Sequence, residues 1–68
     1  MGKIYACVEV IGPMKNFFKE GVYYNGERVV DALISDKNKM KWNAAHCKGK
    51  VYKIGTVGNC VYFVEVQA

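Results

Sequence analysis

Apolar residues recur at every second position in several short stretches of this chain, and this pattern constrains the fold more than any other feature. In residues 3–11, one face carries Ile4, Ala6, Val8 and Val10, and the other carries Lys3, Tyr5, Cys7 and Glu9. Such alternation is typical of a β-strand, because successive side chains point to opposite faces of a sheet. Gly12-Pro13 should end this strand, since proline has no N–H to donate to a neighbouring strand.

Two dipeptides predict hairpins. Asn25-Gly26 tolerates the positive φ angles of a type I′ turn, so we expect residues 22–24 to pair with a strand that runs from Glu27 to about Ile34. In that strand Asp31 should face outward, which places Val30, Ala32 and Ile34 inside. Gly58-Asn59 separates two further apolar runs near the end of the chain and predicts a second hairpin.

The two remaining segments are ambiguous. Residues 13–21 have apolar residues at helical spacing, Met14, Phe17 and Phe18, which indicates one short helical turn or a loop that places its phenylalanines over the end of a barrel. Residues 36–48 begin with Asp36, a plausible helix N-cap, and have Met40, Ala44 and Cys47 at i, i+4 and i+7. This second segment predicts a helix of about ten residues, with an irregular loop as the alternative.

The order of these elements predicts a mainly β protein. Five short strands with one short helix or loop between the third and fourth fit a small five-stranded barrel, either an OB-fold or an SH3-like barrel. Residues 1–68 should form one domain, because a chain of this length supports a single core. About half of the residues are apolar (51%), which argues against intrinsic disorder.

Several functional classes are not expected. No run approaches the ~20 apolar residues of a membrane span, and the first residues lack the apolar core of a signal peptide, so we expect a cytoplasmic protein with no membrane contact. Cys7, Cys47 and Cys60 are odd in number and lack C-x-x-C spacing, which favours reduced thiols over disulfides or zinc. His46 and Cys47 are adjacent and should point apart. The chain therefore predicts no enzyme, no metal and no cofactor.

The positive charge is concentrated in one part of the chain. Residues 36–53 contain six lysines and one acid, a local charge of +5, whereas the rest of the chain carries −1. Lysines beside aromatic rings are typical of proteins that bind single-stranded nucleic acid, and the presence of one arginine, Arg28, argues against sequence-specific readout. The predicted nucleic-acid-binding residues are Lys37, Lys39, Lys41, Trp42, Lys48, Lys50, Tyr52 and Lys53. The alternative is that Trp42 folds over the core and the lysines only increase solubility.

A protein partner is the rival hypothesis. If the first and last strands are neighbours, their outer faces would present Tyr5, Cys7, Val61 and Phe63 together as an apolar patch, which marks an interaction site. The partner would be a second copy of the chain or a foreign protein, as for small inhibitors or adaptors of the kind that compact viral genomes encode. The predicted interface residues are Tyr5, Phe17, Phe18, Val61 and Phe63.

Overall fold

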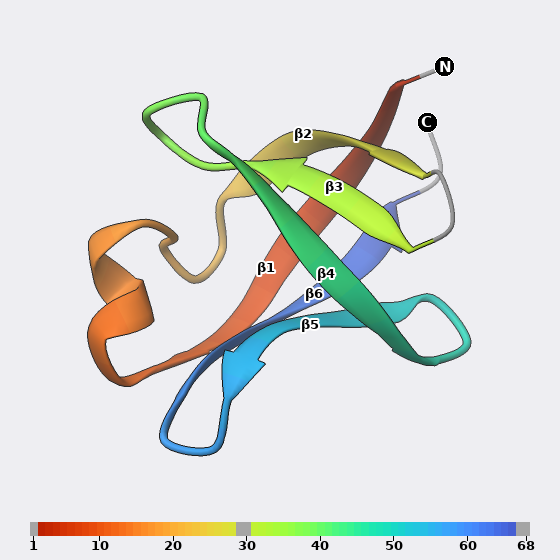
Figure 1. The fold of residues 1–68 in the computed structure, drawn as a ribbon. Helices are drawn as coiled ribbons and strands as arrows, with labels where there is room; N and C mark the ends of the chain where they lie inside the picture. The colour runs from red at the N-terminus through yellow and green to blue at the C-terminus, as the bar shows by residue number, and fades with distance from the viewer. Residues whose placement is uncertain (1, 29–30, 67–68) are drawn as a thin grey trace.

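The computed structural model describes residues 2–28 and 31–66. Its strands form one closed antiparallel barrel, in which each strand pairs with the next in sequence and the first pairs with the last (Figure 1). The strands are β1 (Gly2–Ile11), β2 (Tyr23–Arg28), β3 (Ala32–Ser35), β4 (Lys41–Lys48), β5 (Val51–Thr56) and β6 (Asn59–Val66), and the 3-10 helix η1 (Gly12–Asn16) follows β1.

The mainly β barrel is thus confirmed, with six strands instead of five and with sequential strand order in place of the Greek key of an OB-fold. The additional strand is β4, so the helix predicted within residues 36–48 is wrong. The helical spacing there does not define a buried face, because Ala44 is buried while Met40 and Cys47 are exposed. Pairing of β4 with β3 on one side and β5 on the other decides its conformation.

The first predicted hairpin turn is also wrong. Asn25 and Gly26 lie inside β2 and pair with Ile4 and Lys3 of β1. Gly26 is needed for a different reason: a Cβ there would collide with the carbonyl oxygen of Leu33 and come within 2.8 Å of the Tyr5 ring. The missing side chain therefore makes room for Tyr5 inside the barrel.

The second hairpin is confirmed, one residue earlier than predicted. Val57 and Gly58 connect β5 and β6, and Thr56 pairs with Asn59. Gly58 has a φ of 81°, which glycine adopts without steric cost.

The core fills the inside of the barrel. It consists of Tyr5, Cys7, Met14, Phe18, Ala32, Ile34, Ala44, Tyr52, Ile54, Val61 and Phe63. The predicted inward positions Ala32 and Ile34 and the outward position Asp31 are confirmed, whereas Val30 lies outside the described residues. Both alternatives for residues 13–21 hold in part, since η1 is one short turn and Met14 and Phe18 close one end of the barrel.

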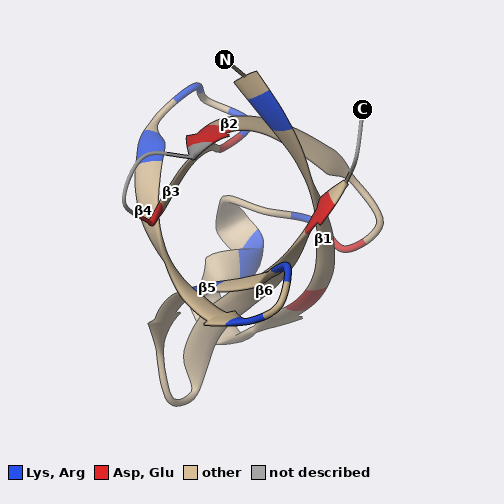
Figure 2. Cartoon of the chain, turned by 90° about the vertical axis from the view of Figure 1, so that its right-hand side faces the viewer, with Lys and Arg blue, Asp and Glu red and all other residues tan. Residues whose placement is uncertain are grey.

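The barrel has two different ends. The terminal end carries Gly2, Lys48 and Val66, and Figure 2 looks into the barrel from this side. The η1 end carries the 3-10 helix, the start of β2, the turn between β3 and β4, and the β5–β6 hairpin (Figure 1). This division decides which of the lysines lie together.

Candidate anion-binding site

The turn between β3 and β4 is built around the side chain of Asp36. Its Oδ1 accepts hydrogen bonds from the backbone N–H groups of Asn38 (2.7 Å) and Met40 (3.0 Å). Two backbone bonds complete the turn, from Asp36 N–H to the Met40 carbonyl (2.9 Å) and from Lys39 N–H to the Asp36 carbonyl (3.0 Å). Asp36 thus caps a tight turn instead of the predicted helix, and the turn places Lys37 and Lys39 at the η1 end.

Trp42 is held by the same carboxylate. Its Nε1 donates to Asp36 Oδ2 (2.9 Å), and its ring packs 5.0 Å from Phe17 and 6.1 Å from Phe18 between ring centroids. The indole is half-buried, so the structure agrees with the alternative in which Trp42 folds over the core. An indole with its N–H and much of its ring already engaged is not a free platform for a base.

Asp36 is ionised at neutral pH. Burial raises the pKa of its carboxyl, but the hydrogen bonds from Trp42, Met40 and Asn38 and the nearby charge of Lys37 outweigh burial and leave the pKa below its ordinary value. The side chain is 5% exposed, and its negative charge is directed at three N–H donors.

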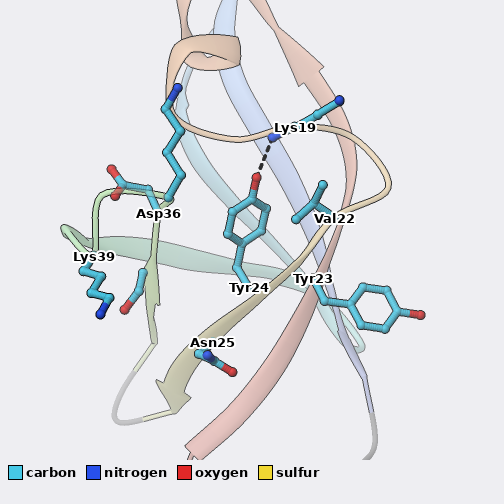
Figure 3. Close-up of a pocket in the computed structure, with 9 residues that line it drawn as sticks. Lys19, Val22, Tyr23, Tyr24, Asn25, Asp36 and Lys39 are labelled. Atoms are coloured by element: carbon cyan, nitrogen blue, oxygen red, sulfur yellow. Dashed lines mark hydrogen bonds between the residues drawn. The ribbon is translucent and has the colours of Figure 1, made fainter.

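Aromatic rings support the η1 end from inside. Phe18 packs edge-to-face against Tyr24 (5.0 Å) and Phe63 (4.9 Å), an arrangement that aromatic quadrupoles favour. The Tyr24 hydroxyl accepts a hydrogen bond from the backbone N–H of Lys19 (2.7 Å; Figure 3). Burial raises the pKa of Tyr24, the Lys19 N–H partly offsets this, and the charges of Cys7 and Asp36 raise the pKa further, so the phenol stays neutral.

An open hollow lies between β2 and the β3–β4 turn. Pairing of β2 with β3 reaches from Arg28–Ala32 only to Gly26–Ile34, so residues 22–25 and 35–39 separate. The hollow has a volume of about 480 Å³, and Figure 3 shows its lining residues: Lys19, Val22, Tyr23, Tyr24, Asn25, Ser35, Asp36, Lys37 and Lys39.

A second hollow of about 470 Å³ adjoins the first and shares Lys19, Tyr24 and Lys37 with it. It adds Lys15, Asn16, Phe17 and Phe18. We call the two together the cationic hollow. Four lysines (15, 19, 37 and 39) surround its aromatic walls, and the acid among its lining residues is Asp36.

Sequence reasoning missed Lys15 and Lys19, because they precede the basic segment by about twenty residues in the chain. A signal for them was present, since both flank the Phe17-Phe18 pair, which one of the two alternatives for residues 13–21 placed over a barrel end. A loop that brings those rings to the barrel end brings the two lysines with it.

The predicted nucleic-acid-binding residues are not one surface. Lys37, Lys39 and Lys41 lie at the η1 end, and Lys48 and Lys50 lie at the terminal end. Seven residues of β4 at ~3.3 Å each separate Lys41 from Lys48 by roughly 23 Å. In Figure 2 the blue segments, which mark Lys and Arg, accordingly occur at several places around the barrel.

Two of the predicted nucleic-acid-binding residues, Tyr52 and Lys53, lie on β5, and their side chains have different environments. Lys53 points outward, with its Nζ 5.7 Å from the centre of the Tyr62 ring. Tyr52 points inward, is 1% exposed, and packs edge-to-face against Tyr5 at 5.5 Å. The prediction that Tyr52 belongs to a binding surface is therefore wrong.

The predicted protein interface is also wrong as an exposed face. Tyr5, Phe18, Val61 and Phe63 are at most 1% exposed, and Phe17 is half-buried against Trp42. The condition for that patch, that the first and last strands are neighbours, is met, since β1 pairs with β6. The two faces were assigned the wrong way round, because the side that carries Tyr5 and Phe63 lines the inside of the barrel.

The thiols and the histidine are separate from one another. His46 Nε2 lies 2.6 Å from the carbonyl oxygen of Gly49, while the Cys47 thiol is directed at the carbonyl of Ala45 (3.7 Å). Burial, together with the charge of Glu20, raises the pKa of Cys7 to about 11, against a smaller lowering by the backbone of Glu9. Over residues 2–28 and 31–66, no three His, Cys, Asp or Glu side chains are grouped as metal ligands.

No helix within the described ranges is long and apolar enough to cross a membrane. No protein-family model, no curated protein and no solved structure matches the chain.

Proposed function

We propose that this protein is a non-catalytic cytoplasmic module that binds single-stranded nucleic acid at the cationic hollow with little sequence preference. The observation that carries the proposal is the arrangement of four lysines, from two segments far apart in sequence, around an aromatic-lined opening. The free thiols of Cys7, Cys47 and Cys60 fit a reducing compartment.

The charges favour a polyanion. Lysine ammonium groups are mobile point charges that follow phosphates without bidentate geometry, so they support affinity more than sequence readout. The carboxylate of Asp36 opposes an anion weakly, because three N–H donors point at its oxygens. Lys19 and Lys37 line both parts of the hollow, so a ligand that occupies both parts would meet these two cations.

The aromatic residues favour unpaired bases. Tyr24 and Phe17 form walls of the hollow, and Tyr23, which is 64% exposed, projects from the other side of β2 (Figure 3). A flexible single strand can place one base in the hollow and the next on Tyr23, and such stacking is worth ~1–3 kcal/mol per base. A duplex keeps its bases stacked inside and offers only its phosphates.

Fluorescence anisotropy of a labelled oligothymidine over a salt series tests the proposal. If four lysines contact phosphates, the slope of log K against log salt should be about −2.8, from ~0.7 per contact. The double variant Lys19→Gln/Lys37→Gln should reduce the slope by about 1.4 units.

The matched control is Lys48→Gln/Lys50→Gln, which removes the same charge at the terminal end. This control should keep most of the slope of the wild-type protein. Affinity that does not change with salt would refute the proposal, as would equal losses in the two double variants.

A further inference from the structure

The outer side of the barrel is apolar where β1, β6 and β5 lie side by side. Alternation directs Ile4, Ala6 and Val8 of β1, Tyr62, Val64 and Val66 of β6, and Val51 of β5 to the outside, opposite the core residues of the same strands. Val8 is 51% exposed and the others are half-buried. We call these seven residues the outer wall.

The strand register arranges the wall in rows. Val64 of β6 pairs with Ala6 on one side and Val51 on the other. Tyr62 pairs with Glu9 on one side and Lys53 on the other, because a bulge at Val8 shifts Glu9 to the outer face. The second row therefore has a negative charge and a positive charge on opposite sides of a central tyrosine.

The row of Glu9, Tyr62 and Lys53 has charges that are complementary to those of the same row in a second copy. Rotation by a half-turn about an axis parallel to β6 exchanges the β1 side with the β5 side and keeps each row at the same height. A second copy placed in this way would set the partner's Lys53 opposite Glu9 and the partner's Glu9 opposite Lys53. It would also set the partner's Val51 opposite Ala6 and stack Tyr62, Val64 and Val66 on the same residues of the partner.

We propose that the outer wall is the contact surface of a homodimer in which β6 of each protomer lies over β6 of the other. The match of a residue with its own copy across a two-fold axis is what an isologous interface requires. A foreign protein would need no such symmetry in the positions of the charges. The cationic hollow lies between β2 and β3, which are not among the three strands of the wall.

The size of the wall sets the expected affinity. Three strands ~4.8 Å apart and about six residues at ~3.3 Å give roughly 300 Å² of projected area per protomer. Standard interfaces bury about 800 Å² per partner, so this dimer should be weak, with a Kd on the order of 10–100 μM. Apolar burial at the wall would add to a core that is small in a 68-residue chain.

Sedimentation velocity from about 5 to 500 μM tests the dimer, since its mass should rise from 7.7 kDa toward twice that value. Glu9→Lys and Lys53→Glu should each raise the Kd about tenfold or more by placing like charges opposite each other. The double variant Glu9→Lys/Lys53→Glu should restore dimerisation, because the pair is exchanged but still complementary.

Glu27→Lys is the matched control, because it makes the same charge change on β2, outside the wall, and should leave the Kd unchanged. Circular dichroism of each variant confirms that the barrel is intact. A wild-type protein that stays monomeric at 500 μM would overturn the proposal. So would a dimer that the double exchange fails to restore.

Discussion

Replacement of Asp36 by asparagine tests whether the carboxylate holds the η1 end together. Asparagine keeps one carbonyl oxygen, which can still accept from the N–H groups of Asn38 and Met40. Its amide group, however, would direct N–H donors at Trp42 Nε1, where the carboxylate now accepts a bond of 2.9 Å. The variant therefore loses one charge-assisted hydrogen bond and leaves two donors facing each other.

The expected cost follows from the bond that is lost. A hydrogen bond to a charged group contributes about 1.5–3 kcal/mol, and an unsatisfied part-buried donor costs a similar amount, with partial relief from water. We expect Asp36→Asn to lower the free energy of unfolding by about 2–3 kcal/mol near pH 7. Asp31→Asn is the control, because Asp31 is exposed, and it should cost less than about 0.5 kcal/mol.

Lowering the pH should reduce the difference in free energy of unfolding between the wild-type protein and Asp36→Asn. The pKa of Asp36 is lower in the folded state than in the unfolded chain, so between the two values the unfolded state binds more protons and stability falls with falling pH. The contribution of the carboxylate is complete above its ordinary pKa of ~4 and is lost as the pH falls through the lower folded value. The gap between wild type and Asp36→Asn should thus narrow below pH 4.

Urea unfolding followed by Trp42 fluorescence at pH 7, 5 and 3 measures both effects. The reasoning would be refuted by an asparagine variant within about 0.5 kcal/mol of wild type at pH 7. It would be refuted equally by a gap of the same size at pH 7 and pH 3.

Three further predictions concern other parts of the barrel. Gly26→Ala should destabilise the protein by about 2 kcal/mol or more in urea unfolding, because the new Cβ collides with the Leu33 carbonyl oxygen and the Tyr5 ring, whereas Gly2→Ala, whose Cβ would come no closer than 3.9 Å to a neighbouring atom, should be tolerated. Cys7, buried and with a pKa of about 11, should resist iodoacetamide near pH 8 while exposed Cys47 reacts, and equal labelling in peptide maps would contradict this. Tyr23→Ala should weaken oligothymidine binding about tenfold with unchanged stability; unaltered anisotropy titrations would remove Tyr23 from the site.

Local patterns in the chain were sufficient for most of the strands, but they missed β4 and assigned the faces of β1 and β6 the wrong way round. Period two predicts β1 and β6 correctly, but both faces of β1 carry apolar residues, with Ile4 and Ala6 on one and Tyr5 and Cys7 on the other. Only the closure of the barrel decides between them, because the inside accommodates Tyr5 opposite a residue without a side chain, Gly26. That residue is 21 positions away, beyond the reach of a pattern read along the sequence.

Patterns along the sequence also could not predict which residues form the cationic hollow. The basic segment was visible in the sequence, but β4 carries its lysines to opposite ends of the barrel. The cationic hollow combines Lys37 and Lys39 with Lys15 and Lys19, which no local rule would join. Trp42 was correctly placed over the core by the alternative interpretation, and its partner Asp36 was identified as a cap, although of a turn and not of a helix.

Closure of the barrel by β1 and β6 has a consequence for how the chain folds. Every other strand pair joins neighbours in sequence, whereas this pair joins Ile4 to Val66 and requires the longest loop closure in the molecule. A chain that emerges during synthesis therefore has two open strand edges, on β1 and β5, until Asn59–Val66 is available. Open edges pair readily with other chains. Truncation within β6 should thus leave the edges of β1 and β5 exposed in the finished protein and cause it to aggregate.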